Sequence, residues 1–512
     1  MNILSLQFIA LMCAAAAVYQ IFPKRMRWTA LTAADVIYVL LAQDLMLTAV
    51  MAVQITVTFA AACLLDSQNS GRTALQKKHI MAAAVSFNAA VMILFKEINF
   101  FLYPVRLILR AAGAGVSIPF MHWNAPAGLS YYSLIFIAYI LDVYWGVSQA
   151  ERNPGKMILF AAFFPILTSG PFIRYRDISE SLYAGNSITY HSMTYGLQRI
   201  LWGLFKSLVI SNRLGVLVGT IYADPAGYPG AYEFLAFVSF VLQLYTNFSG
   251  CIDIIIGISQ IFGIEMPENF DSPFYSLSIS EFWRRWHMTL GLWLKDYVLY
   301  PLLKSKRFRE LGKTAKRKYG KKWGKQAPLF AGLLITWFLI GFWHGGGWNY
   351  IWGCGIYYGI LIILGEMCGP ALLRVNERLG INSSSRGWIA FQRIRTFLIF
   401  TAGLSFFRSY DGLICGLKRW GYALSVWNPG IFFDGSICRL GLDRYDIAVL
   451  AVSLAILWIV DVIGHKRSVR DTLAEQNIVI RWGLLLALIF VVIIFGQYGS
   501  TYNASSFIYG KF

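Results

Sequence analysis

Gly341-Phe342-Trp343-His344-Gly345-Gly346-Gly347-Trp348 ends a long apolar run that begins near Pro328. The run places an ionisable histidine at membrane depth, among aromatic residues and glycines. Ionisable groups inside a bilayer are costly and usually mark a functional path. Three consecutive glycines let a neighbouring helix or a ligand come close, and one helix is not expected to run unbroken through them. A neutral histidine can take a proton from a hydroxyl group and return it later, so His344 is a candidate catalytic base.

The composition predicts an integral membrane protein. Of the 512 residues, 57% are hydrophobic, 16% are aromatic and only 14% are charged, which is not a soluble globular composition. Apolar runs of about 20 residues recur along the chain, and they are continuous rather than alternating, which disfavours a β-barrel. We therefore expect an all-α polytopic membrane protein with about 11 to 13 membrane segments, some of them re-entrant or interfacial.

The positive charge is concentrated in one place. The net charge is +19, and residues 304–325 hold eleven Lys or Arg and a single acid, Glu310, which together give +10. Short basic segments beside membrane spans face the cytoplasm, so we interpret 304–325 as a basic cytoplasmic loop at anionic lipid headgroups, not as a nucleic-acid site. A role in docking an acidic carrier protein or the phosphates of CoA is the alternative. The seven cysteines form no CxxC pair, and we expect no metal site.

A second histidine lies in Glu281-Phe282-Trp283-Arg284-Arg285-Trp286-His287. Ser278 followed by Glu281 fits a capping box, and we expect one helix from Ser278 to about Leu303. This segment is too polar for a lipid-exposed span, so it should lie at the interface or inside the bundle with its charges paired. Glu281 is spaced for pairing with Arg284 or Arg285.

Several motifs together resemble the membrane-bound O-acyltransferase (MBOAT) superfamily, in particular its bacterial branch of alginate O-acetylases. Besides 281–287 and 342–345, the resemblance rests on the following segments: Pro126–Ser130, Ser169–Pro171, Pro267–Phe274 and the C-terminal Ser506–Phe512. It covers residues 1–512, which we interpret as a single transmembrane domain. The resemblance implies a ring of tilted helices around a central tunnel.

The resemblance also implies roles for individual residues. His344 would be the catalytic residue, and His287 would support catalysis near the acyl path. Candidates for contact with the acyl donor are Arg284, Arg285, Asn269 and Trp343. For the two arginines we favour membership of ion pairs over contact with the donor, and for Asn269 we favour a role in the turn-like, proline-rich segment that contains it.

The implied reaction moves an acyl group, expected to be acetyl, from a cytosolic thioester to hydroxyl groups outside the cytoplasm. The donor would be acetyl-CoA or another acyl thioester, used as a substrate rather than held as a tightly bound cofactor. The acceptor would be an exported cell-surface polysaccharide or a partner protein resembling SGNH hydrolases. The location would be the inner (plasma) membrane of a bacterium.

The chemistry of acyl transfer agrees with these residue types. The reaction needs a base, a donor to the developing oxyanion and exclusion of water. The amides of Gly345–Gly347 or the indole N–H groups of Trp343 and Trp348 are candidate oxyanion donors. His344 lies 19 residues after Lys325, which is roughly 28 Å of helix at most. His344 is therefore expected between the middle and the outer side of the bilayer.

Two alternatives stay open at this point. One is D-alanyl transfer to teichoic acid from a carrier protein, within the same superfamily. The other, of a different class, is a membrane transporter, which would also have many spans and buried polar residues; no inverted repeat is evident in the sequence.

Overall fold

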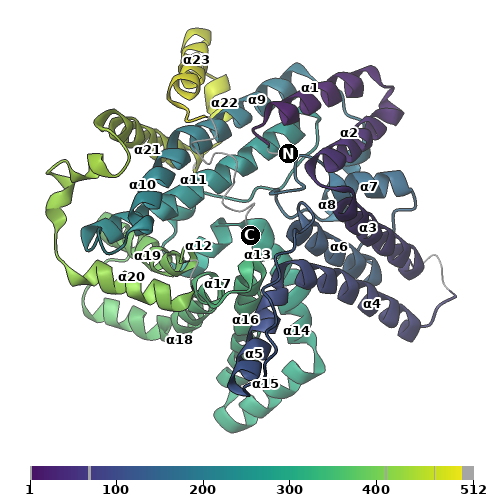
Figure 1. Cartoon of the computed structure of the whole chain (residues 1–512), viewed down its shortest axis with the longest axis horizontal. Helices are drawn as coiled ribbons and strands as arrows, with labels where there is room; N and C mark the ends of the chain where they lie inside the picture. The colour runs from purple at the N-terminus through teal and green to yellow at the C-terminus, as the bar shows by residue number, and fades with distance from the viewer. Residues whose placement is uncertain (1–2, 67–70, 410–411, 466, 499–512) are drawn as a thin grey trace. The chain divides into compact units, whose positions relative to one another are not determined.

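The computed structural model describes residues 3–66, 71–409, 412–465 and 467–498 (Figure 1). Within these residues the secondary structure is helical, and the only strand-like pairing is an isolated antiparallel bridge between Phe270 and Trp286. The C-terminal motif Ser506–Phe512 lies outside the described residues.

Eight helical stretches in the described part are long and apolar enough to cross a membrane. They are Leu45–Leu65, Ala74–Ala111, Tyr190–Ala223, Ala231–Ile261, Lys321–Gly345, Trp348–Arg378, Arg444–Gly464 and Ile478–Phe495. The apolar helices Leu6–Ile21 and Leu129–Tyr144 are shorter. The prediction of an all-α polytopic membrane protein is confirmed. The expected 11 to 13 segments exceed the eight, because several apolar runs form helices that are short or interrupted.

The chain divides into two compact units. The first comprises the residues up to Leu204 and Gly250–Pro267. Its principal helices are α1 (Leu6–Ile21), α2 (Arg27–Ala42), α3 (Leu45–Leu65), α4 (Ala74–Met92), α5 (Ile98–Ala111), α6 (Leu129–Tyr144), α7 (Pro154–Ala162), α8 (Tyr175–Tyr183) and α9 (Tyr190–Leu204). Within this unit the half-buried Arg199 of α9 donates to the half-buried Asp253 at 3.0 Å.

The second unit comprises Phe205–Ser249 and the residues from Glu268 onward. Helix α11 (Ala231–Ile261) contributes to both units. The other α-helices of the second unit are α10 (Asn212–Ala223), α12 (Ile279–Arg285), α13 (Met288–Leu294), α14 (Tyr300–Lys304), α15 (Lys306–Tyr319), α16 (Lys321–Gly345), α17 (Trp348–Tyr350), α18 (Tyr357–Arg378), α19 (Arg386–Phe407), α20 (Leu413–Ser425), α21 (Arg444–Gly464), α22 (Val469–Ala474) and α23 (Ile478–Phe495). Both candidate histidines belong to this unit.

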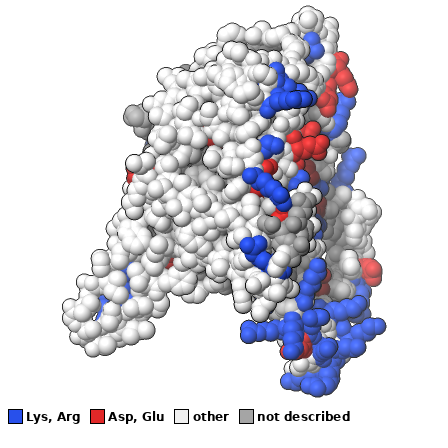
Figure 2. Space-filling model, turned by 90° about the vertical axis from the view of Figure 1, so that its right-hand side faces the viewer, with Lys and Arg blue, Asp and Glu red and all other residues white. Residues whose placement is uncertain are grey.

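The basic segment 304–325 is helical, not a loop as expected. Helix α15 and the first turn of α16 are joined at Gly320, whose φ of +89° reverses the chain. Ala315 of α15 is buried and Phe308 of α15 lies beside Gly332 of α16, whereas all eleven Lys and Arg side chains are exposed. Figure 2 shows this dense group of basic side chains. The charges therefore form a fixed basic surface on a helical hairpin.

Helices α16 and α19 run in the same direction. Trp337 of α16 packs on Tyr358, which packs on Phe400 of α19. Seven residues further along each helix, His344 of α16 packs on Phe407 of α19. Matching contacts at matching intervals require parallel helices, so the basic end of α16 and the N-terminal end of α19 lie on the same side of this unit.

Candidate active site

His344 lies in the last turn of α16 and is only 3% exposed. The helix ends directly after it, because Gly346 adopts a left-handed φ of +58° that favours glycine. The imidazole ring contacts the Trp343 ring with centroids 4.8 Å apart and the edge of Phe407 at 5.9 Å. The expectation that no single helix runs through the three glycines is confirmed. His344 is thus held in an aromatic enclosure at the end of a helix.

The close crossing of two backbone segments fixes the position of the end of α16, where His344 lies. Helix α16 crosses the π-helical segment η6 (Ile351–Ile356), and a Cβ atom on Gly341 would lie 2.5 Å from the Cα atom of Ile351. From the other side, a Cβ atom on Gly355 would lie 2.5 Å from the carbonyl oxygen of Trp337. Only glycine permits this approach, so these positions determine where the end of α16 sits.

The glycine amides expected as oxyanion donors are partly engaged. The N–H of Gly346 donates to Phe342 at 2.9 Å, and the N–H of Gly347 donates to Gly345 at 2.6 Å. The Trp348 side chain is 55% exposed. Trp343 is half-buried and stays in contact with the histidine ring.

Asn349 is the residue of this region that sequence reasoning missed. It follows the glycine turn, is 3% exposed, and its side-chain Nδ2 is buried without a hydrogen-bond partner among the described residues. A buried amide donor without a partner costs free energy, so such a group usually serves a ligand, a water molecule or a reaction. The sequence around Asn349 contains no pattern that predicts either its burial or the missing partner of its side-chain nitrogen.

His287 lies between two helices rather than within one. The expected helix from Ser278 ends at Arg285, because Trp286 bridges to Phe270 and His287 adopts a left-handed φ of +48°. A non-glycine residue in this conformation is strained, and such strain is concentrated at functional sites. Helix α13 then begins at Met288.

Asn269 maintains this conformation through its side-chain oxygen. The Oδ1 atom lies 3.2 Å from His287 Nδ1 and accepts hydrogen bonds from Thr289 N at 3.1 Å and Thr289 Oγ1 at 2.8 Å. Because Oδ1 can only accept, His287 carries its proton on Nδ1, and Nε2 keeps its lone pair. Burial lowers the pKa of His287 to about 3, so the ring is neutral. Asn269 is fully buried, and its Nδ2 meets no partner among the described residues.

The two arginines of the motif differ in their surroundings. Arg285 donates to Glu281 at 3.1 Å and to Asp271 at 3.0 Å. The expected i, i+4 pair with Glu281 is therefore made by Arg285, and the Ser278 cap is present as expected, with its hydroxyl accepting from Glu281 N. Arg284 is exposed. The geometry of Arg285 is that of an ion pair that holds α12 against the 268–272 segment, while Arg284 stays available for a ligand.

Helix α19 contacts the surroundings of both histidines. Phe400 packs on Phe282 at 4.0 Å and on Trp286 at 5.0 Å, directly before His287. Phe407, which packs on His344, lies seven residues further along the same face, about 10 Å away along the helix axis. The two motifs, separated in sequence, thus meet on one face of one helix. Among the described residues, no group of three or more His, Cys, Asp or Glu is arranged to hold a metal ion.

Comparison with known proteins identifies the family. The family model of MBOAT, the membrane-bound O-acyltransferase family, matches residues 152–315. The probable alginate O-acetylase AlgI of Pseudomonas syringae pv. tomato is 30% identical over 366 residues, which cover 71% of this chain and 63% of that relative. The chain belongs to the membrane-bound O-acyltransferase family.

Other MBOAT relatives act on different polymers according to their names. The peptidoglycan O-acetyltransferase of Helicobacter pylori is 29% identical over 54% of this chain and 53% of its own length. The teichoic acid D-alanyltransferase of Bacillus subtilis is 28% identical over 46% of this chain and 57% of its own length. The chain thus spans between about half and two thirds of the length of these relatives. The MBOAT match includes Asn269 and His287 and ends before His344.

Proposed function

We propose that this protein is an O-acetyltransferase that moves an acetyl group from a cytosolic thioester to hydroxyl groups of an extracytoplasmic cell-envelope polysaccharide. One observation carries the proposal: a histidine is buried at the end of a membrane helix, and the glycine turn that follows it leads to Asn349, a buried amide donor without a partner among the described residues. The names of the relatives support acyl transfer to such polymers.

In the proposed mechanism, His344 is the general base. Its imidazole takes the proton of the acceptor hydroxyl while the hydroxyl oxygen attacks the thioester carbonyl carbon. Negative charge develops on the carbonyl oxygen, and the Asn349 Nδ2 group donates a hydrogen bond to it. The C–S bond then breaks, the thiolate leaves with the proton from the imidazolium, and the acetyl ester stays on the acceptor. The surrounding aromatic rings exclude water that would hydrolyse the thioester.

His287 supports this reaction from the neighbouring motif. Its Nδ1 lies 3.2 Å from Asn269 Oδ1, so the lone pair of the neutral ring is on Nε2, and in this proposal Nε2 faces the acyl donor. A neutral ring in this position can accept a hydrogen bond from the acceptor hydroxyl or from the donor's amide groups without adding charge to the enclosed region. The unpartnered Nδ2 of Asn269 is a second candidate contact to the donor, and the exposed Arg284 and the Trp343 ring are others.

We propose that the basic surface of α15 and α16 faces the cytoplasm of a bacterial cell and that acetyl-CoA enters from this side. Transfer to a partner protein of the SGNH-hydrolase type is the variant of this scheme in which a protein hydroxyl is the first acceptor. D-alanyl transfer is less well supported, because the D-alanyltransferase of B. subtilis matches only 46% of this chain.

The test is transfer across a reconstituted membrane. Protein in liposomes receives radiolabelled acetyl-CoA on one side and a polysaccharide on the other, and CoA release and polymer-bound acetate are both counted. We expect wild-type protein to release CoA only when the donor is on the side of α15. The Asn349→Ala variant should lose about 10²–10³-fold in kcat with little change in the KM for acetyl-CoA. Transfer of D-alanine from a carrier protein, without transfer of acetate, would contradict the proposal.

A further inference from the structure

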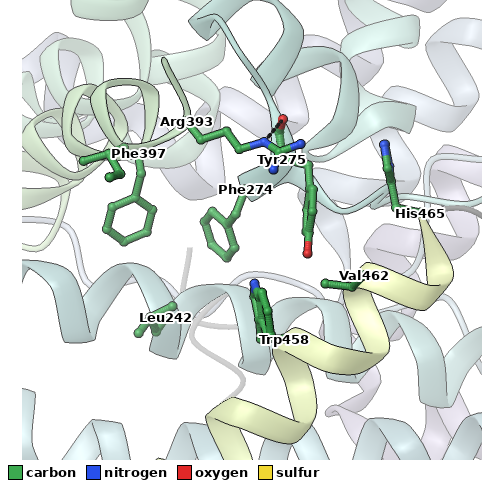
Figure 3. A pocket seen from close by; sticks show the side chains of 9 residues that line it. Leu242, Phe274, Tyr275, Arg393, Phe397, Trp458, Val462 and His465 are labelled. Carbon is green, nitrogen blue, oxygen red and sulfur yellow. Dashed lines mark hydrogen bonds between the residues drawn. The ribbon is translucent and has the colours of Figure 1, made fainter. Parts of the chain in front are cut away.

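A cavity of about 680 Å³ lies in the second unit, away from both histidines' immediate contacts. Figure 3 shows it between α11, the segment at Phe274 and Tyr275, α19 and α21. Most of its lining is apolar, with Leu242, Phe274 and Phe397 among the residues that form it. Its size is within the range of about 300–1,000 Å³ that is typical of ligand cavities.

The polar groups gather at one end of the cavity. The Arg393 guanidinium lies 4.7 Å from the Tyr275 ring and donates to the Tyr275 carbonyl oxygen at 3.3 Å. The His465 ring stacks on the Tyr275 ring, and the two ring centroids are 5.2 Å apart. Among the described residues, no carboxylate oxygen lies within 4.0 Å of the Arg393 guanidinium. The cavity therefore combines an apolar interior with a cation at its mouth.

The interior contains a hydrogen-bonding group as well. The Tyr275 hydroxyl is buried, meets no hydrogen-bond partner among the described residues, and points into the cavity toward Trp458 and Val462 (Figure 3). The nearby acid, Asp461, accepts a hydrogen bond from the Tyr245 hydroxyl at 3.2 Å. A ligand of this cavity thus needs an acceptor for Tyr275 between an anionic end and an apolar end.

The cavity opens toward the surface that a bilayer would cover. Trp458 is 64% exposed and Ile394 is 60% exposed, and Trp458 lies on α21, one of the candidate spans. Large exposed apolar residues on a membrane span contact lipid. A water-soluble, strongly charged molecule such as CoA does not fit an opening of this kind.

The charged end of the cavity lies on the basic side of the unit. Arg393 precedes Phe400 by seven residues on α19, which is about 10 Å further from His344. Because α19 runs parallel to α16, this displacement leads toward the end where α15 carries its exposed basic residues. Basic residues at one end of a membrane helix attract anionic lipid headgroups.

We propose that this cavity is a binding site for one anionic phospholipid. The phosphate lies against Arg393 and His465, an ester oxygen accepts from the Tyr275 hydroxyl, and one acyl chain fills the apolar part beside Phe274, Phe397 and Leu242. The site differs from the proposed acyl-transfer site in its ligand, its position and its chemistry, so it can be tested without measuring acetyl transfer.

The test is lipid retention by the full-length protein in detergent, measured by native mass spectrometry. Phosphatidylglycerol and phosphatidylcholine are added in equal amounts. We expect wild type to retain one phosphatidylglycerol in preference, and Arg393→Gln to lower that preference by about tenfold, equivalent to about 1.4 kcal/mol. The matched control is Arg386→Gln, which removes an exposed arginine of the same helix that does not line the cavity. It should retain lipid like wild type.

A second variant addresses the apolar part. Ile394→Trp adds bulk at the cavity mouth from a largely exposed position, so the fold should be kept and phosphatidylglycerol should be lost. The proposal is overturned if Arg393→Gln and Arg386→Gln behave alike, if both lipids are retained equally, or if acetyl-CoA displaces the bound lipid. The last outcome would assign the cavity to the acyl donor instead.

Discussion

The substitution Asn269→Ala tests how the left-handed His287 is held. The Asn269 side-chain oxygen accepts from His287 Nδ1, Thr289 N and Thr289 Oγ1 at 3.2, 3.1 and 2.8 Å. Removal of the oxygen leaves two buried N–H donors without an acceptor, since only the threonine hydroxyl can rotate elsewhere. At about 1–3 kcal/mol for each buried unsatisfied donor, the free energy of unfolding should fall by about 2–6 kcal/mol.

The assay is unfolding by a denaturing detergent, followed by tryptophan fluorescence. Asn349→Ala is the matched control, because that residue is equally buried and its side-chain nitrogen makes no hydrogen bond among the described residues. Its truncation should cost clearly less. In a double-mutant cycle, Thr289→Val should couple to Asn269→Ala by about 1 kcal/mol, the value of one hydrogen bond. Equal losses in the two alanine variants, or no coupling, would refute the reasoning.

Three further predictions concern the surroundings of the site. Arg285→Ala should lower the free energy of unfolding by about 1–3 kcal/mol, because it breaks two charged hydrogen bonds, while Arg284→Ala at an exposed position should change it by less than about 0.5 kcal/mol; chemical unfolding of both variants measures this. The Gly341→Ala variant should lose about 1–3 kcal/mol in the free energy of unfolding, because the added methyl group lies 2.5 Å from the crossing backbone. The Gly365→Ala variant, in open space on α18, should gain about 0.5–1 kcal/mol. Thermal unfolding of the two variants measures the difference. The free energy of unfolding should fall as the pH drops from 6.5 toward about 3, because in this range His287 binds a proton in the unfolded chain and not in the folded chain. The His287→Gln variant should reduce the dependence of the free energy of unfolding on pH by up to about 1.4 kcal/mol per pH unit. An unchanged pH dependence would count against a buried neutral ring.

The features predicted correctly from the sequence depend on local chemistry. Apolar runs of sufficient length form membrane helices whatever their neighbours, and the Ser278 cap needs only a residue three positions away. The end of α16 at its glycines is local as well, because the positive φ at Gly346 depends on the missing side chain.

The features that were predicted wrongly or missed depend on distant partners. The helix from Ser278 breaks at His287 because Phe270 and Asn269, earlier in the chain, bind the segment at that point. Asn349 differs from an ordinary surface asparagine only in its burial, which depends on the packing of distant segments.

The basic segment shows a different kind of error. The segment expected to be a loop contains the helix α15. Its apolar residues, among them Ala315, alternate with the charged residues at helical spacing. The helix is indicated by the spacing of the residues between the charges, whereas the charges alone are compatible with a loop.

The central claim is that His344 is the catalytic base of an acyl transfer. The most direct test is acetyl-CoA consumption by purified protein in lipid bilayers. Wild type is compared with His344→Ala, His287→Ala and the control His79→Ala, which changes an exposed histidine of α4, each with a check of folding. We expect His344→Ala to be folded and inactive, His287→Ala to be impaired, and His79→Ala to match wild type. A folded His344→Ala variant that consumes acetyl-CoA at the wild-type rate would contradict the account.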